Sequence, residues 1–214
     1  MGIKKTTPVG RFSFVNVFTP RSRDGGKARY ECTLLLDKGD PATEEFRKFV
    51  GKATVQLAKE KWPKFFETAG SVKEAMDNLG IKPPIKDGDG SDGVSGQGER
   101  LAGMAGNYFI RTSRREDKGK PHVVDANVEP ILNQSEVYSG AYGRISVDMY
   151  AFEHSGNRGV TFDLCNVQKS HDGEPLGGGG QSRAEDDFGK LSVPGTGADD
   201  PPNYGGEEDE DDWM

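Results

Sequence analysis

Residues 142–152 place the strictest limit on the fold, because apolar and polar side chains alternate along them. The alternating run is Arg144, Ile145, Ser146, Val147, Asp148, Met149, Tyr150, Ala151 and Phe152. A repeat of two residues is that of a β-strand with one buried and one exposed face. Such a half-buried strand is typical of antiparallel sheets, so the sequence predicts a sheet of this kind.

Further strand signals lie on both sides of a helical region. Runs rich in aromatic and β-branched residues predict strands at 11–18, 27–36, 107–113, 122–124 and 159–168. Asp40-Pro41 is typical of a helix start, and apolar residues at helical spacing extend the predicted helix over 41–60. Trp62-Pro63 ends or kinks this helix, and a shorter helix is expected around 71–79.

About five strands in a meander with an inserted helix, and no βαβ rhythm, describe a small mainly-β domain. The sequence predicts a five-stranded antiparallel barrel of the oligonucleotide/oligosaccharide-binding (OB) type, with an α+β sandwich as the alternative. We expect the OB domain to occupy residues 1–176, with a helical insertion at 41–80 and a flexible loop at 82–100. Residues 177–214 are expected to be a disordered Gly/Pro-rich linker and acidic tail.

The charge is distributed unevenly, although its sum is −7. Residues 177–214 hold two basic and 11 acidic side chains, and residues 1–176 hold 26 basic and 24 acidic ones. The first thirty residues carry seven basic side chains against Asp24 alone. A basic body joined to an acidic tail remains compatible with a polyanionic partner, in spite of the acidic overall balance.

Several classes of protein are disfavoured by what the sequence lacks. No apolar run approaches the roughly 18 residues of a membrane-spanning helix, and no secretory signal precedes the first strand. Cys32 and Cys165 show no CxxC spacing and suggest no disulfide framework, which favours a soluble protein of a reducing cytoplasm. His122, His154 and His171 have no ligand spacing, and Asp87–Gly93 departs from a calcium loop. We therefore expect no enzyme activity, no metal and no cofactor.

Aromatic and basic residues occur together in four segments, as in proteins that bind single strands. Such proteins neutralise phosphates with cations and stack bases on aromatic rings. The candidate DNA-binding residues are Arg11, Phe12, Phe14, Arg21, Arg23, Lys27, Arg29, Tyr30, Tyr108, Arg111, Arg114, Tyr142, Arg144 and Tyr150. Each phenylalanine could instead belong to the core, the cations of 21–29 could form an ordinary solvated loop, and Arg114 could pair with Glu116 or Asp117.

Three segments carry a resemblance to a known family. Residues 11–20 with 30–37 resemble the opening hairpin of phage-encoded single-stranded DNA-binding proteins, and 138–152 with 159–177 are similar to the closing strands of that family. Residues 207–214 resemble the acidic tail with an aromatic residue found on many replication single-strand binders. The resemblance implies an OB barrel that coats single-stranded DNA during replication or recombination, in the cytoplasm of the infected bacterial host. It also implies tail partners such as a polymerase, a helicase or a primase, and a possible homodimer or cooperative array on DNA.

The acidic block has a physical interpretation of its own. Six consecutive acids precede one indole ring, in the order Glu207, Glu208, Asp209, Glu210, Asp211, Asp212 and Trp213. Like charges in such a block repel one another and oppose folding. The apolar residue favours a docking peptide over a purely solubilising tail, and the negative charge predicts competition with DNA for the groove. Two other functions remain open: a protein-interaction or assembly module, and RNA binding of the cold-shock kind.

Overall fold

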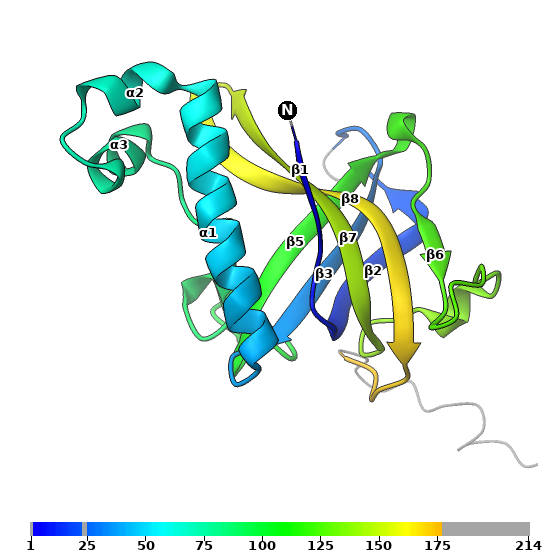
Figure 1. Ribbon diagram of the computed structural model, residues 1–214. Coiled ribbons are helices and arrows are strands. Elements are labelled where there is room, and N and C mark those ends of the chain that lie inside the picture. Colours follow the sequence, from blue (N-terminus) through cyan, green and yellow to red (C-terminus); the bar gives the residue numbers. More distant parts are fainter. Residues whose placement is uncertain (1, 23–24, 177–214) are drawn as a thin grey trace, which may run out of the picture. The chain divides into compact units, whose positions relative to one another are not determined.

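The computed structural model describes residues 2–22 and 25–176, which form an eight-stranded mixed sheet with three helices gathered beside it (Figure 1). The strands are β1 (Ile3–Thr6), β2 (Gly10–Arg21), β3 (Arg29–Asp37), β4 (Lys86–Asp87), β5 (Asn107–Arg115), β6 (His122–Val124), β7 (Tyr142–His154) and β8 (Asn157–His171). The helices are α1 (Pro41–Lys61), α2 (Pro63–Thr68) and α3 (Val72–Leu79). All the strands expected from the sequence are present, and β1 and β4 are additional short ones.

Five strands form a closed circuit of pairings, in the order β7, β2, β3, β5, β8 and back to β7. The circuit closes because β7 pairs with β2 at one end and with β8 along its whole length. The other strands pair at its edges: β1 with β7, β4 with β5, and β6 with β8.

The expectation of a five-stranded, wholly antiparallel sheet is wrong in two respects. The sheet has eight strands, and β8 runs parallel to both β5 and β6. The parallel pairing of β5 with β8 follows from the number of strands in the circuit. Five strands in a closed circuit cannot all run antiparallel to both of their neighbours, so at least one pair must be parallel. The remaining four pairings in the circuit are antiparallel.

The core lies inside this circuit and is built from alternate residues of its strands. Fully buried side chains are Phe12 and Val17 of β2, Leu34 and Leu36 of β3, Ile110 of β5, Ile145, Val147 and Met149 of β7, and Phe162, Leu164 and Val167 of β8. Each such side chain contributes about 1.5–3 kcal/mol relative to leaving it exposed. The intervening residues face outward. Leu35 of β3 and Phe109 of β5 are among them and are buried on that side in a second cluster with Met104.

The helices attach to one end of the sheet through α1. Asp40 caps α1 by accepting a hydrogen bond from the Ala42 amide at 2.8 Å, and Phe46, Val50 and Leu57 bury one face of the helix in the core. The Trp62-Pro63 pair separates α1 from α2, as its sequence predicts. Helix α1, the longest of the described helices, is not long and apolar enough to cross a membrane, nor is any other within that part of the chain.

The segment 82–100 is held against the sheet, whereas the sequence suggested a flexible loop. Its strand β4 pairs with β5, and Lys38 Nζ contacts Asp87 Oδ1 at 2.5 Å and Asp89 Oδ2 at 2.7 Å. Arg100 donates a hydrogen bond to the Asp89 carbonyl at 3.1 Å. These contacts join residues far apart in sequence, which is why glycine and proline content did not reveal them.

Candidate nucleic-acid interface

A groove of about 480 Å³ lies on the outer face of the sheet and crosses four strands of the circuit. Its lining includes Phe14 of β2, Glu31 and Thr33 of β3, Arg111 of β5, Thr161 of β8, and Leu101 from the segment before β5. The groove thus combines an exposed aromatic ring and a cation with a carboxylate and small polar groups. The ring and the cation are the groups with which proteins bind single-stranded nucleic acid.

Strand register explains why these side chains share one face. Thr33 is opposite Arg111 and Ser13 across the two strand pairs, and Glu31 is opposite Ser113. Directly opposed residues of antiparallel strands project from the same side of the sheet. The residues between them on β3, including Cys32 and Leu34, point into the core.

Phe14 is the residue of β2 that departs from strand geometry. The register between β2 and β3 shifts between Ser13 and Asn16, and Phe14 has a left-handed backbone with φ of 49°. A bulge changes which side chains face inward and can redirect a single residue. Phe12 before the bulge is fully buried and Val17 after it is 1% exposed, while Phe14 is 45% exposed in the groove. The bulge therefore decides the face assignment that the sequence left open.

Three arginines form a row across one end of β2, β3 and β5. Arg29 of β3 is opposite Arg21 of β2 on one side and Arg115 of β5 on the other. Like charges at directly opposed positions repel one another, so this row favours an anionic partner. Asp117 contacts Arg115 at 3.0 Å, and Arg29 donates to Ser113 Oγ at 3.3 Å. Lys27 is exposed at the same hairpin, and Arg23 lies outside the described residues.

Arg111 is held in place within the groove by its neighbours. Its Nη2 donates a hydrogen bond to the Asp92 carbonyl at 3.3 Å, and its guanidinium lies 5.1 Å from the Phe109 ring centroid. Asp92 belongs to the segment that Lys38 fastens through Asp87 and Asp89. Hydrogen bonds from Lys38 hold the pKa of Asp87 and of Asp89 below the ordinary range. The Lys38 contacts thus stabilise one wall of the groove.

Three predicted site residues have structural roles. Phe12 and Tyr30 belong to the core, at 0% and 8% exposure, so neither ring offers a face to a base. Arg114 contacts Asp163 at 3.6 Å and donates hydrogen bonds of 2.7 Å to the carbonyls of Lys118 and Gly119. The guanidinium is thereby committed to holding the 116–119 turn. We leave these three side chains out of the candidate interface.

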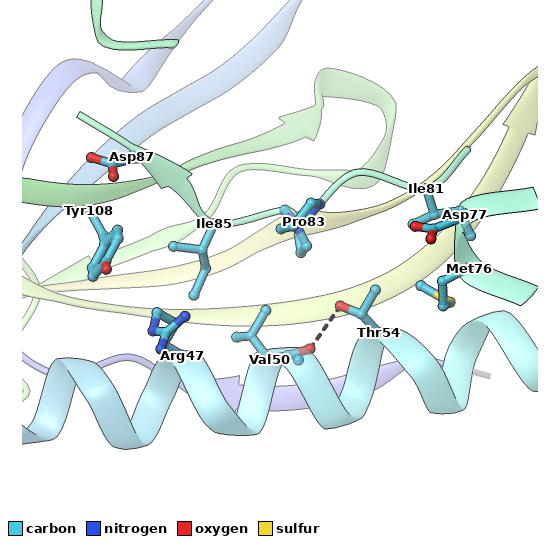
Figure 2. Close-up of a pocket in the computed structure, with 12 residues that line it drawn as sticks. Arg47, Val50, Thr54, Met76, Asp77, Ile81, Pro83, Ile85, Asp87 and Tyr108 are labelled. Atoms are coloured by element: carbon cyan, nitrogen blue, oxygen red, sulfur yellow. Dashed lines mark hydrogen bonds between the residues drawn. The ribbon is translucent and has the colours of Figure 1, made fainter. Parts of the chain in front are cut away.

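Tyr108 lies in a different hollow, of about 480 Å³, between α1 and the segment that follows α3 (Figure 2). Figure 2 shows Val50 of α1 facing Ile85 and Pro83, with Tyr108 at one end. Lys38 Nζ lies 4.9 Å from the Tyr108 ring centroid, and the Arg47 guanidinium lies 5.7 Å from it. This hollow shares no lining residue with the groove, so the structure separates Tyr108 from Phe14 and Arg111.

The predicted residues of β7 divide between its two ends. Tyr142 stacks on His171 with 4.7 Å between ring centroids, and the Arg11 guanidinium lies 5.7 Å from the Tyr142 ring. Arg144 donates a hydrogen bond of 2.7 Å to Gln168 Oε1. Tyr150, at the other end, is opposite Thr161, which lines the groove. Of the β7 residues proposed from sequence, Tyr150 alone adjoins the groove.

Several residues of the groove are not among the DNA-binding residues predicted from the sequence. Thr33 and Ser113 give no chemical signal by themselves, although strand alternation would place them on the outer face. Leu101 reaches the groove from a segment without periodicity. In residues 2–22 and 25–176, no cluster of three or more His, Cys, Asp or Glu side chains is placed to hold a metal ion.

Solved structures of phage proteins share this fold, among them two single-stranded DNA-binding proteins. The single-stranded DNA-binding protein from bacteriophage Enc34, in complex with ssDNA, has a TM-score of 0.61, with 20% identity over 81% of this chain and 89% of that chain. The single-stranded DNA-binding protein gp2.5 encoded by bacteriophage T7 has a TM-score of 0.55, with 13% identity over 90% of this chain and 100% of that chain. At these identities the likeness establishes the fold.

Comparison of sequences extends the likeness to a family. Protein p50 of Acyrthosiphon pisum secondary endosymbiont phage 1 is 26% identical over 185 residues, which cover 86% of this chain and 91% of that protein. The family model described as Enterobacter phage Enc34, ssDNA-binding protein, matches residues 3–199. Because this match spans most of the 214 residues, the chain belongs to the family of the Enterobacter phage Enc34 ssDNA-binding protein.

Proposed function

We propose that this protein binds single-stranded DNA in the groove over β2, β3 and β5, with little preference for sequence. The observation that carries the proposal is Phe14, which a bulge places in the groove that Arg111 also lines. Strained backbone conformations cluster at active sites and ligand-binding sites, which supports a function for the exposed Phe14 ring. Family membership and the fold shared with phage single-stranded DNA-binding proteins support the same conclusion.

We further propose that the closed circuit of five strands is an OB-type barrel, formed by the domain of residues 1–176. Its support is the order of the pairings, in which β8 closes the circuit by pairing with both β5 and β7. OB barrels bind oligonucleotides on the outer face of their strands, and the groove occupies such a face here.

The chemistry assigned to the groove and to the basic end of β2 and β3 has two parts. Arg21, Lys27, Arg29 and Arg111 neutralise phosphates and release counterions, which makes the affinity fall with salt. The Phe14 ring stacks on a base, an interaction worth about 1–3 kcal/mol that tolerates any base. Neither part reads the edge of a base, and this accounts for the lack of sequence preference.

In the infected bacterial cytoplasm, the proposed role is to coat and protect single strands during phage DNA replication and recombination. The segment 207–213 recruits replication proteins such as a polymerase, a helicase or a primase, and competes with DNA for the groove. Support for this part comes from composition, because six acids and a tryptophan combine negative charge with an apolar group. A homodimer or a cooperative array on the strand belongs to the same proposal.

A titration of fluorescently labelled oligo(dT), followed by anisotropy at about 20 and 300 mM salt, tests the proposal. We expect saturable binding that weakens at the higher salt and exceeds the binding of a duplex of equal length. Labelled oligo(rU) separates DNA binding from RNA binding. Failure of the full chain and of a chain lacking 205–214 to bind oligo(dT) at low salt would overturn the proposal and favour an assembly module.

A further inference from the structure

We propose that the bound strand leaves the groove across Thr161 and stacks a second base on Tyr150, so that the interface crosses β8 and reaches β7. This inference rests on the function proposed above. It adds the path of the bound DNA over the sheet and a second residue on which a base stacks. Phe14 and Tyr150 then form the two ends of one interface.

The register of β7 and β8 joins the two sites. Tyr150 is directly opposite Thr161, and Thr161 lines the groove that contains Phe14. The neighbours Met149, Val160 and Phe162 are buried, so Tyr150 and Thr161 both face outward. Opposed outward residues of an antiparallel pair have Cβ atoms about 4.5–5.5 Å apart. The surface is thus continuous from the groove to the Tyr150 ring.

Cations lie near Tyr150, as Arg111 lies in the groove with Phe14. Lys118 Nζ lies 5.7 Å from the Tyr150 ring centroid. Tyr150 and Lys61 also line a hollow of about 410 Å³ beside the last turns of α1. Lys61 donates a hydrogen bond of 3.0 Å to the Ala151 carbonyl and makes no ion pair within residues 2–22 and 25–176. An aromatic face with adjacent ammonium groups fits a base together with its phosphate.

Asp163, two positions after Thr161 on β8, is paired with two cations. Asp163 contacts Lys118 Nζ at 3.0 Å and Arg114 Nη1 at 3.6 Å, and its side chain is only 13% exposed. Glu60, which also lines the hollow beside α1, accepts a hydrogen bond from Gln56 at 3.0 Å. Because two cations share the Asp163 carboxylate, Arg114, Lys118 and Asp163 together keep one positive charge on the route to Tyr150.

The other end of β7 offers a less suitable surface. Tyr142 lies eight positions before Tyr150, which corresponds to about 26 Å along a strand. One face of its ring is occupied by His171, with the two ring centroids 4.7 Å apart. Tyr142 is opposite Arg11 of β2, so a DNA strand that ran from Phe14 directly over the β2–β7 pair would reach Tyr142. A DNA strand that follows the groove over β3, β5 and β8 reaches Tyr150 instead.

The spacing of the two rings sets the length of stacked single strand that can contact both. From β2 to β7 by way of β3, β5 and β8 there are four strand steps, or about 19 Å. At the 3.4 Å spacing of stacked nucleotides, this distance corresponds to about six nucleotides. Shorter oligonucleotides can contact one ring and longer ones can contact both.

Oligo(dT) of 4, 6, 9 and 12 nucleotides, titrated by anisotropy at low salt, tests the inference with three variants of the full chain. We expect Tyr150→Leu to weaken the binding of the 9-mer and the 12-mer about tenfold, the scale of one lost stack, and to leave the 4-mer unchanged. Phe14→Leu is expected to weaken every length. Tyr142→Leu is the matched control and should bind as the wild type does, and Tyr150→Phe should retain the affinity.

A measurement on the wild-type protein tests the inference without depending on how well the variants fold. Photo-crosslinking to a 9-mer that contains 5-iodouracil, followed by trypsin digestion, should label peptide 145–158, which contains Tyr150, as well as peptide 12–21. Labelling of 12–21 without 145–158, or equal binding of Tyr150→Leu and wild type at all lengths, would overturn the inference while leaving the proposed function intact. If the wild type bound no oligo(dT), the proposed function itself would fail.

Discussion

Phe14 projects into the groove although Phe12, two residues earlier on the same strand, is fully buried. A regular strand would place both rings on one face. The register shift after Ser13 and the φ of 49° at Phe14 separate them, so that one ring completes the core and the other is exposed. A left-handed conformation costs a bulky residue about 1–3 kcal/mol, which indicates that this position serves a purpose other than stability.

The two phenylalanines should therefore respond in opposite ways to substitution. Phe14→Leu should lower the affinity for oligo(dT) about tenfold, because one stack is lost, and should change the free energy of unfolding by less than about 0.5 kcal/mol. Phe12→Ala should lower the free energy of unfolding by about 3–5 kcal/mol, because it leaves a cavity. Anisotropy and urea unfolding measure the two effects. A Phe14→Leu variant with wild-type affinity would contradict this assignment.

Arg111 should contribute to the salt dependence of binding. Arg111→Gln removes one phosphate contact, so the slope of log K against log salt should become shallower by about 0.7. Arg47→Gln is the control, because Arg47 lies on α1, where it contacts Glu44 at 2.7 Å. Titrations at four salt concentrations give both slopes. Equal slopes for Arg111→Gln and the wild type would remove Arg111 from the interface.

Acidification should loosen the wall of the groove. Hydrogen bonds from Lys38 lower the pKa of Asp87 and of Asp89. A carboxylate with a lowered pKa stabilises the folded state above its unfolded pKa of about 3.9, and this contribution is lost as the pH falls through the folded value. The wild type should therefore lose more stability between about pH 5 and pH 2 than the double variant Asp87→Asn, Asp89→Asn.

Urea unfolding at several pH values measures this difference. Glu67→Gln removes a carboxylate of α2 that makes no ion pair in the described part of the chain, and it should follow the wild-type curve. If the double variant and the wild type lost stability in parallel, the Lys38 contacts would not contribute to the acid response.

Removal of residues 205–214 should raise the affinity for oligo(dT) at low salt. The deleted residues contain six consecutive acids, which attract the cations of the groove and compete with phosphates. The gain should diminish at about 300 mM salt, because screening weakens the competition. Anisotropy at both salt concentrations measures it. A variant in which the six acids are replaced by Asn and Gln is the matched control, and unchanged affinity in both variants would exclude competition.

The sequence by itself determined the strands and the limits of the helical region. Alternation of apolar side chains located β7, and the Asp40-Pro41 and Trp62-Pro63 pairs marked both ends of α1, because these signals act over a few neighbouring residues. The sequence also showed that basic side chains cluster in the hairpin between β2 and β3. Strands β1 and β4 were missed, because two to four residues at a sheet edge carry too short a pattern.

Only the tertiary structure decided which aromatic residues meet the groove. The sequence gathered Phe12, Phe14, Tyr30 and Tyr108 into one candidate interface, and the structure places the first and third in the core and the fourth beside α1. Local sequence shows that a strand has two faces, but a bulge, the pairing register and the closing of the circuit determine which face is enclosed. These depend on contacts between residues distant in the chain, as between Thr33 and Arg111 or Tyr150 and Thr161.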